Sequence, residues 1–215
     1  MSDAQASTVK PAADAAQSAH GAQGGAHASQ AKPVKVAKPL DDIASKPVTK
    51  SLNHDFQLQP NFYYCGPAAT RIALSANGHN LSQDEIAQKL GTTEAGTNSA
   101  VEITKGLNGV LGGDKYKTTS MGDDVTPEKM DKLQADVVHA LNDGRPVVAN
   151  IAGTAFDTDG GVHSYPGGHY LTVVGYTDQG RTVEIADPAN PNGTITYKMT
   201  TIELAKWMAT RGYSA

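Results

Sequence analysis

The single cysteine of the chain, Cys65, stands where its neighbours favour reactivity. Gly66 and Pro67 follow it, and then a run of good helix formers, so we expect Cys65 at the start of a helix. The free backbone N–H groups and the dipole of a helix start favour the thiolate over the thiol. A free cysteine more often packs as a small buried hydrophobic residue, so its interpretation depends on which partners accompany it.

Gln59 lies six residues before Cys65 and is the first such partner. Its side-chain amide and the backbone N–H of Cys65 would together make a donor pair suited to a negatively charged carbonyl oxygen. Gln57 is a competing donor that spacing alone does not reject. A single cysteine also excludes an intramolecular disulfide and a multi-cysteine metal site.

Among seven histidines, strand geometry selects His169 as the base. It follows two glycines and opens an apolar strand over residues 169–177. A second strand is expected over 182–187. The residues between them, Asp178-Gln179-Gly180, suit a three-residue hairpin loop with the glycine in a left-handed conformation.

This loop predicts the register of the hairpin, pairing Thr177 with Arg181 and Val173 with Ile185. His169 and Asp187 then stand at the end of one face as diagonal neighbours, about 7–8 Å apart at the backbone. A two-residue loop would turn Asp187 to the opposite face. The predicted core face carries His169, Leu171, Val173, Val183, Ile185 and Asp187, and the other face carries Tyr170, Thr172, Val174 and Tyr176.

The other histidines are interpreted as ordinary: His163 is assigned to a glycine-rich loop and His139 to a helix. Asp157 and Asp159 precede two glycines, which makes calcium a minor alternative there. The spacing of an EF-hand is missing, so we expect no metal site.

Helical periodicity precedes strand periodicity along the chain, which predicts an α+β domain with a helical N-terminal half and an antiparallel sheet in the C-terminal half. A capping box at Ser82–Glu85 marks one helix start. We expect helices over 68–76, 82–91, 98–110 and 126–144, strands over 146–152, 169–177, 182–187 and 194–199, and a last helix from residue 200 around Trp207.

Composition divides the 215 residues into two parts. Residues 1–50 are rich in alanine, proline and lysine and contain no aromatic side chain, which predicts a disordered tail ahead of a folded domain at 51–215. The net charge of −4 gives no basic excess for nucleic-acid binding. No apolar run approaches the length of a membrane-spanning helix.

Three segments of the sequence now carry a family resemblance: Gln59-Pro-Asn-Phe-Tyr-Tyr-Cys65-Gly-Pro, Gly168-His169-Tyr170 and Ala186-Asp187-Pro188. Together they resemble the bacteriocin-processing (double-glycine leader) peptidases of the papain-like superfamily, most of all their free-standing, secreted actinobacterial branch. Transporter-linked members usually carry Asp or Asn where this chain has Tyr64, so cleavage after a double glycine does not follow from the resemblance.

The resemblance implies a papain-like cysteine peptidase that acts on peptides or proteins, as a monomer and without a cofactor or metal. Cys65 would be the nucleophile, His169 the base, Asp187 the residue that orients it, and Gln59 the oxyanion donor. No apolar signal-peptide segment follows Met1, so we expect a mature secreted form, with a cytoplasmic location as the alternative.

The same residue types leave other functions open. A Cys-His-Asp set also serves transglutaminases and other acyltransferases, and it serves endolysin-type peptidases that cleave peptidoglycan stems. A catalytically inactive binding or adhesion module is the alternative outside enzymes.

Overall fold

The computed structural model describes residues 39–189 and 196–215. Most of the predicted tail, residues 1–38, lies outside the described residues, as do 190–195, where the predicted strand 194–199 begins. Within the described residues, every helix is too short or too polar to span a bilayer.

Five α-helices and a seven-stranded antiparallel sheet make up the described part of the chain. The helices are α1 (Cys65–Ser75), α2 (Gln83–Leu90), α3 (Ala100–Leu111), α4 (Pro127–Asn142) and α5 (Thr201–Trp207), with short 3-10 helices η1 (Asp41–Ile43) and η2 (Asp178–Gly180). The strands are β1 (Lys50–Ser51), β2 (Thr118–Ser120), β3 (Val147–Phe156), β4 (Val162–Thr177), β5 (Thr182–Ala186), β6 (Thr196–Thr200) and β7 (Gly212–Ser214).

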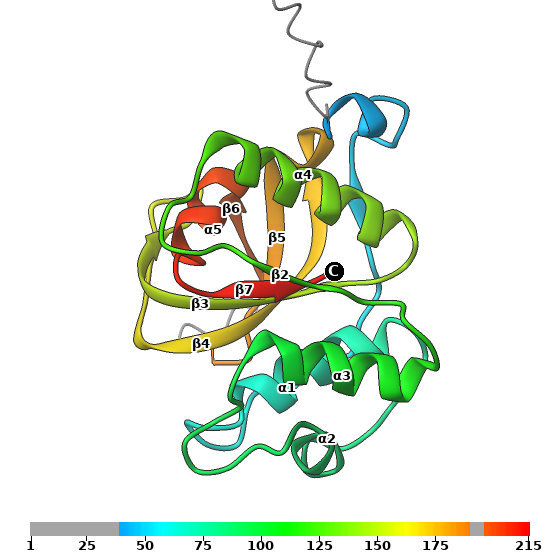
Figure 1. Ribbon diagram of the computed structural model, residues 1–215, viewed down its shortest axis with the longest axis vertical. Helices are drawn as coiled ribbons and strands as arrows, with labels where there is room; N and C mark the ends of the chain where they lie inside the picture. The colour runs from blue at the N-terminus through cyan, green and yellow to red at the C-terminus, as the bar shows by residue number, and fades with distance from the viewer. Residues whose placement is uncertain (1–38, 190–195) are drawn as a thin grey trace, which may run out of the picture. The chain divides into compact units, whose positions relative to one another are not determined.

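The sheet separates two groups of helices (Figure 1). Helices α1, α2 and α3 share one hydrophobic core with side chains of one sheet face, including Val148 and Tyr170. Helices α4 and α5 share a larger core with the opposite face, including Ala149 and Val173. Because successive side chains of a strand point to opposite faces, the central strands are buried on both sides. The predicted α+β class is confirmed.

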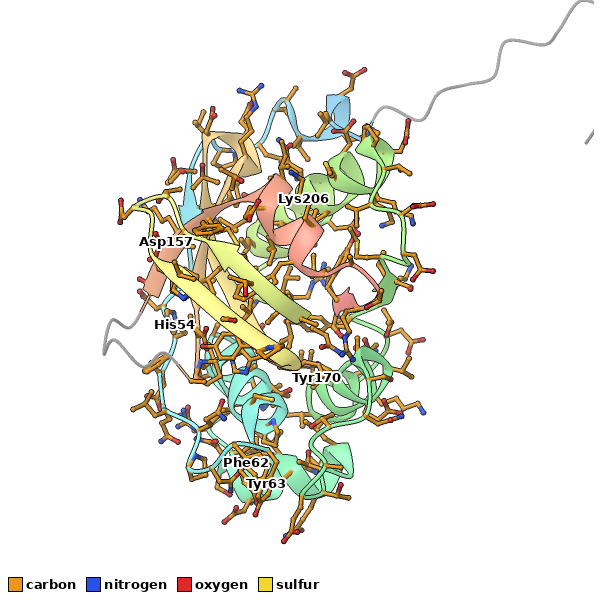
Figure 2. The ribbon with its side chains drawn as sticks, turned by 90° about the vertical axis from the view of Figure 1, so that its left-hand side faces the viewer. His54, Phe62, Tyr63, Asp157, Tyr170 and Lys206 are labelled. Carbon is orange, nitrogen blue, oxygen red and sulfur yellow. The ribbon has the colours of Figure 1, made fainter. Side chains whose placement is uncertain are left out.

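Strands β3 and β4 form a long hairpin that reaches from Asp157 at one end to Tyr170 near the other (Figure 2). The order across the sheet is β2-β7-β3-β4-β5-β6, and β1 pairs with the end of β4. The short strands β1, β2 and β7 were not predicted, because two or three residues are too few to show an alternating pattern.

Three of the predicted helix starts are confirmed. Ser82 and Glu85 form the expected capping box at the start of α2, and the Thr126 side chain accepts a hydrogen bond from the Lys129 backbone N–H at the start of α4. Thr200 caps α5 in the same way. These caps satisfy backbone N–H groups that have no partner within the helix.

The β4–β5 hairpin has the predicted register only at the end away from its turn. Thr172 pairs with Ala186 and Val173 with Ile185, as expected. A bulge between Val173 and Gly175 then shifts the pairing by one residue, so that Thr177 lies opposite Thr182. The predicted Thr177–Arg181 pair is wrong.

The physical reason lies in the turn. Asp178, Gln179 and Gly180 have φ angles of 50°, 51° and 84°, and the pairing of the flanking threonines leaves four residues in the loop instead of three. The bulge absorbs the extra residue. It also places Tyr176 in the core shared with α4, and not on the opposite face as predicted.

The folded domain begins earlier than residue 51. Ile43 is 2% exposed and packs in the core beside α4. The Tyr176 hydroxyl donates to the Pro47 carbonyl at 2.9 Å, and the Leu52 N–H donates to the Val174 carbonyl. Composition averaged over residues 1–50 conceals two apolar side chains that anchor residues 39–50, the buried Ile43 and the partly buried Leu40.

We therefore expect Ile43→Ala to destabilise the domain by about 2 kcal/mol or more, since it removes a buried branched side chain and leaves a cavity. Urea unfolding followed by circular dichroism measures this change. Val48→Ala is the matched control, because Val48 is 60% exposed and should cost little. Equal midpoints for both variants and the wild type would show that residues 39–50 contribute nothing to stability.

Candidate active site

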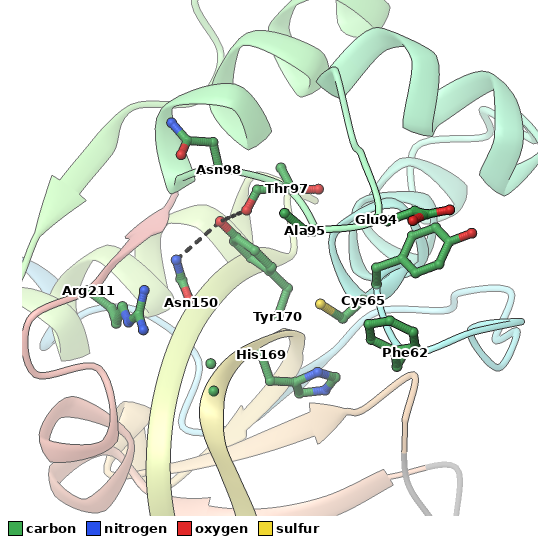
Figure 3. A pocket seen from close by; sticks show the side chains of 14 residues that line it. Phe62, Cys65, Glu94, Ala95, Thr97, Asn98, Asn150, His169, Tyr170 and Arg211 are labelled. Carbon is green, nitrogen blue, oxygen red and sulfur yellow. Dashed lines mark hydrogen bonds between the residues drawn. The ribbon is translucent and has the colours of Figure 1, made fainter.

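Cys65 is the first residue of α1 and is 8% exposed. It lines a cavity of about 340 Å³ together with His169 (Figure 3). The helix N-cap, Tyr64, makes no side-chain capping hydrogen bond, so the first N–H groups of α1 are not capped by a side chain. The predicted position of Cys65 at a helix start is confirmed.

Gly66 allows the wall of this cavity to approach the cysteine. A Cβ atom at Gly66 would lie 2.2 Å from the Thr97 hydroxyl oxygen, a distance that no side chain tolerates. Thr97 belongs to the α2–α3 connection, and its carbonyl accepts a hydrogen bond from the Tyr170 hydroxyl at 3.2 Å. Glycine after the cysteine is therefore a requirement of packing between α1 and this loop.

His169 and Asp187 meet as the predicted register requires. His169 lies on β4 and Asp187 directly follows β5, and the distance from His169 Nε2 to Asp187 Oδ1 is 2.7 Å. Both side chains are buried, at 4% and 0% exposure of the residue. With Nε2 bonded to the carboxylate, Nδ1 is the ring nitrogen left for the hydrogen bond between the imidazole and the Cys65 thiol.

Two tyrosines complete the environment of Asp187. The hydroxyls of Tyr165 and Tyr197 both donate to Asp187 Oδ2 at 3.0 Å, and the Ala189 N–H donates to Oδ1 at 3.0 Å. The Tyr165 ring also stacks on the His169 ring at 4.0 Å between centroids. The carboxylate thus accepts four hydrogen bonds, which matches its capacity and fixes its orientation.

The electrostatics favour a thiolate–imidazolium pair. Burial raises the pKa of Cys65, but the hydrogen bond and charge of His169, with the N–H groups of Tyr170 and Gly66, outweigh it and leave the pKa below its usual value. Burial lowers the pKa of His169, but hydrogen bonds to Asp187 and Cys65 raise it to about 9.

Asp187 stays ionised in this setting. Burial raises its pKa, but the hydrogen bond and charge of His169 together with the Ala189 N–H and Tyr165 hydroxyl hold it below its usual value. Burial and the negative charge of Asp187 raise the pKa values of Tyr165 and Tyr197 well above the ordinary range. Both tyrosines therefore keep the protons that they donate.

Gln59 lies near the carboxylate but is not among the residues that line the cavity. Its backbone N–H donates to the Pro188 carbonyl at 2.9 Å, next to Asp187. Its side-chain amide nitrogen donates to the Asn61 carbonyl at 2.7 Å. Gln57, the competing donor, is exposed and lines a separate depression beside Arg71.

Sequence reasoning missed Tyr165 and Tyr197. Tyr165 lies before the predicted strand, and the β3–β4 register shifts between it and His169, so regular strand periodicity does not identify it. Tyr197 reaches Asp187 only because β6 pairs with β5, with Tyr197 opposite Ile185. The sequence between β5 and β6 gives no signal of their register.

His163 is not the loop residue that was predicted. It lies on β4, is 5% exposed, and its Nε2 is 2.9 Å from Asp157 Oδ2. Its ring stacks on Tyr197 at 3.8 Å. Asp157 also accepts hydrogen bonds from the backbone of the hairpin turn. Across the described part of the chain, no three His, Cys, Asp or Glu side chains gather as a metal site would require.

The model of the Peptidase_C39 like family matches residues 51–215 of the chain. The search of curated proteins found no match to the chain.

Several solved structures are similar in fold. A structure described as a C39-like peptidase from Bacillus anthracis is 16% identical, with 77% of this chain and 96% of that chain covered and a TM-score of 0.51. Xylellain, a cysteine protease from Xylella fastidiosa, is 15% identical, with 81% and 87% covered and a TM-score of 0.51. The peptidase domain of Streptococcus ComA is 19% identical, with 76% and 97% covered and a TM-score of 0.48. The likeness to xylellain confirms the predicted papain-like fold.

The pKa directions predict how Cys65 reacts with iodoacetamide. In the wild type the imidazolium persists up to about pH 9, so the paired thiolate is present well below the usual thiol pKa. Asp187→Asn removes the charge that supports the imidazolium, lowers the His169 pKa and so raises that of Cys65. We expect alkylation at pH 6 to slow by about tenfold or more, because an opposite charge in contact shifts a pKa by roughly 1–3 units.

Mass spectrometry of the alkylated protein measures this rate across pH. Asp178→Asn is the control, since Asp178 lies in the exposed β4–β5 turn and should leave the profile unchanged. Superimposable rate profiles for Asp187→Asn and the wild type would mean that the carboxylate does not support the thiolate.

Proposed function

This chain belongs to the Peptidase C39-like family and is a papain-like cysteine peptidase, and we propose that Cys65, His169 and Asp187 form its catalytic triad. The observation that carries this proposal is the 2.7 Å contact between His169 and the buried Asp187, with the Cys65 thiol hydrogen-bonded to the same imidazole. A nucleophile, a base and an orienting carboxylate in that order are the parts that thiol acyl transfer needs.

In the first step the Cys65 thiolate attacks the carbonyl carbon of the peptide bond, and a C–S bond forms. The carbonyl oxygen becomes an oxyanion. As the oxyanion collapses, His169 gives its Nδ1 proton to the peptide nitrogen, the C–N bond breaks and the amine leaves. An acyl group then remains on Cys65 as a thioester.

Water completes the reaction. The neutral imidazole of His169 removes a proton from a water molecule, whose oxygen attacks the thioester carbonyl. The C–S bond breaks, the carboxylic acid product leaves, and the thiolate–imidazolium pair is restored. Asp187 stays ionised throughout and holds His169 in one tautomer, because its Oδ1 accepts the Nε2 hydrogen.

The oxyanion needs donors that are already in place. Cys65 is the first residue of α1, where backbone N–H groups have no partner within the helix, and its N–H is the first donor we assign. Gln59 is the second. Its amide nitrogen carries two hydrogens, and the hydrogen bond to the Asn61 carbonyl uses one of them.

The substrates in this proposal are peptides or proteins, and the chemistry uses no cofactor. A secreted, free-standing and monomeric enzyme is also part of the proposal, since the sequence resemblance points to that branch. Supplying primary amines distinguishes hydrolysis from acyl transfer: a transglutaminase-like enzyme would form amide products, whereas a peptidase releases the free acid.

We expect Cys65→Ala to lower turnover by about 10⁴-fold or more while preserving the fold, since alanine suits a helix start. His169→Ala should be similarly inactive, and His139→Ala on α4 should stay active. Digestion of a peptide library, followed by mass spectrometry, measures all three against the wild type. Retained cleavage by Cys65→Ala would remove it as the nucleophile.

Loss of one oxyanion donor should lower kcat about 10²- to 10³-fold. We therefore expect Gln59→Ala to show such a drop with a modest change in KM, measured by steady-state kinetics on a peptide from the library. Gln57→Ala is the matched control and should behave as wild type. The reverse result, with Gln57→Ala impaired and Gln59→Ala active, would assign the second donor to Gln57.

A further inference from the structure

The cavity at Cys65 carries one positive charge that the peptidase mechanism does not use. Arg211 lines this cavity together with Asn150, and both lie on one side of Cys65 (Figure 3). Phe62 and Glu94 lie on the other side, so the two ends of the cavity differ in charge. An enzyme that binds an extended peptide across Cys65 would present Arg211 to one flank of the scissile bond.

The backbone holds Arg211 firmly at this place. It sits in the tight turn between α5 and β7, where its N–H donates to the Met208 carbonyl at 2.9 Å and its carbonyl accepts from the Met121 N–H at 2.8 Å. The preceding residue, Thr210, has a φ of 65°, a conformation that costs energy for a non-glycine residue. These contacts fix the backbone position of Arg211 before any ligand binds.

The guanidinium lies against the residue next to the catalytic histidine. A Cβ atom at Gly168 would be 3.2 Å from Arg211 Nη2, and Gly168 has a φ of 98°, so glycine leaves the room that the guanidinium occupies. His169 follows directly in the chain. Arg211 is therefore within the reach of a substrate side chain or terminus bound beside the reacting bond.

This charge has no protein partner among the residues that the structure describes. No carboxylate forms an ion pair with Arg211, and its Nε, shielded from solvent, has no hydrogen-bond acceptor. The one acidic residue that lines the cavity, Glu94, is exposed and lies beyond Cys65. A permanent cation at the cavity wall without a carboxylate partner favours the binding of an anion, which would supply the missing counter-charge.

We propose that Arg211 binds a carboxylate of the substrate, so that the enzyme selects peptides with an acidic group at a fixed distance from the cleaved bond. A planar guanidinium offers paired N–H donors that match a carboxylate in geometry and charge. That carboxylate comes either from an Asp or Glu side chain or from the C-terminus of the peptide. The inference rests on the peptidase function proposed above.

The experiment is a digest of a peptide library by the full chain, with each cleavage site identified by mass spectrometry. We expect Asp or Glu to be enriched at one position relative to the cleaved bond. Each substrate is also made as the free acid and as the C-terminal amide. Loss of cleavage only in the amide would assign the carboxylate to the C-terminus, and equal cleavage of both would assign it to a side chain.

Arg211→Gln tests the residue itself. We expect the preference for Asp over Asn, or for free acid over amide, to fall roughly 10- to 100-fold in kcat/KM, mainly through KM. Arg211→Lys should retain part of the preference, since lysine keeps the positive charge but lacks the paired N–H donors of the guanidinium. Arg181→Gln removes a 71% exposed arginine in the β4–β5 turn and should leave the preference unchanged. The rate of Cys65 alkylation verifies that each variant keeps its folded site.

The outcomes separate the two proposals. If the wild type cleaves peptides with no acidic preference, or if Arg211→Gln keeps the full preference, the assignment of Arg211 is wrong and the peptidase function stands. If the wild type cleaves no peptide, the peptidase function fails, and the assignment of Arg211 fails with it.

Discussion

A buried carboxylate, Asp187, sets the main constraint on this structure. Its residue is 0% exposed, and an ionised group in that position is tolerated only when hydrogen bonds replace its hydration. The donors come from both neighbouring strands: His169 and Tyr165 from β4, and Tyr197 from β6. The sheet must therefore pair in one register around β5. A slip of one residue would turn the carboxylate away from these partners.

The nucleophile comes from the helical layer that packs on one face of the sheet. The packing between this layer and the sheet therefore matters as much as the pairing of the strands. Cys65 begins α1, and α1 packs on the sheet face opposite the α4–α5 core. Two hydrogen bonds near the site connect the sheet to the helical layer: the Thr172 hydroxyl donates to the Ala69 carbonyl at 2.8 Å, and the Tyr170 hydroxyl donates to the Thr97 carbonyl. They hold the thiol against the imidazole, and a small shift between the layers would separate the two.

A second histidine–carboxylate pair packs against the residues that hold Asp187. His163 and Asp157 occupy the far part of the β3–β4 hairpin, and His163 stacks on Tyr197, which itself donates to Asp187. The partly buried Asp157 and the buried rings of His163 and Tyr197 thus pack together along one side of the hairpin. Packing of this kind fixes side-chain positions, because a buried polar group that loses its partner costs free energy.

Local sequence determined much of this protein. Helix caps at Ser82, Thr126 and Thr200 could be predicted because a cap is a short-range hydrogen bond. The contact between His169 and Asp187 was predicted from alternating side chains and a three-residue loop, and it holds because the bulge compensates for the fourth loop residue. The β-bulge before Gly175 and the buried Ile43 escaped this reasoning, since turn geometry and long-range packing decided them. Only the tertiary structure brought Tyr197 to Asp187 and Arg211 to Gly168, because strands and turns distant in sequence meet there through the sheet and core.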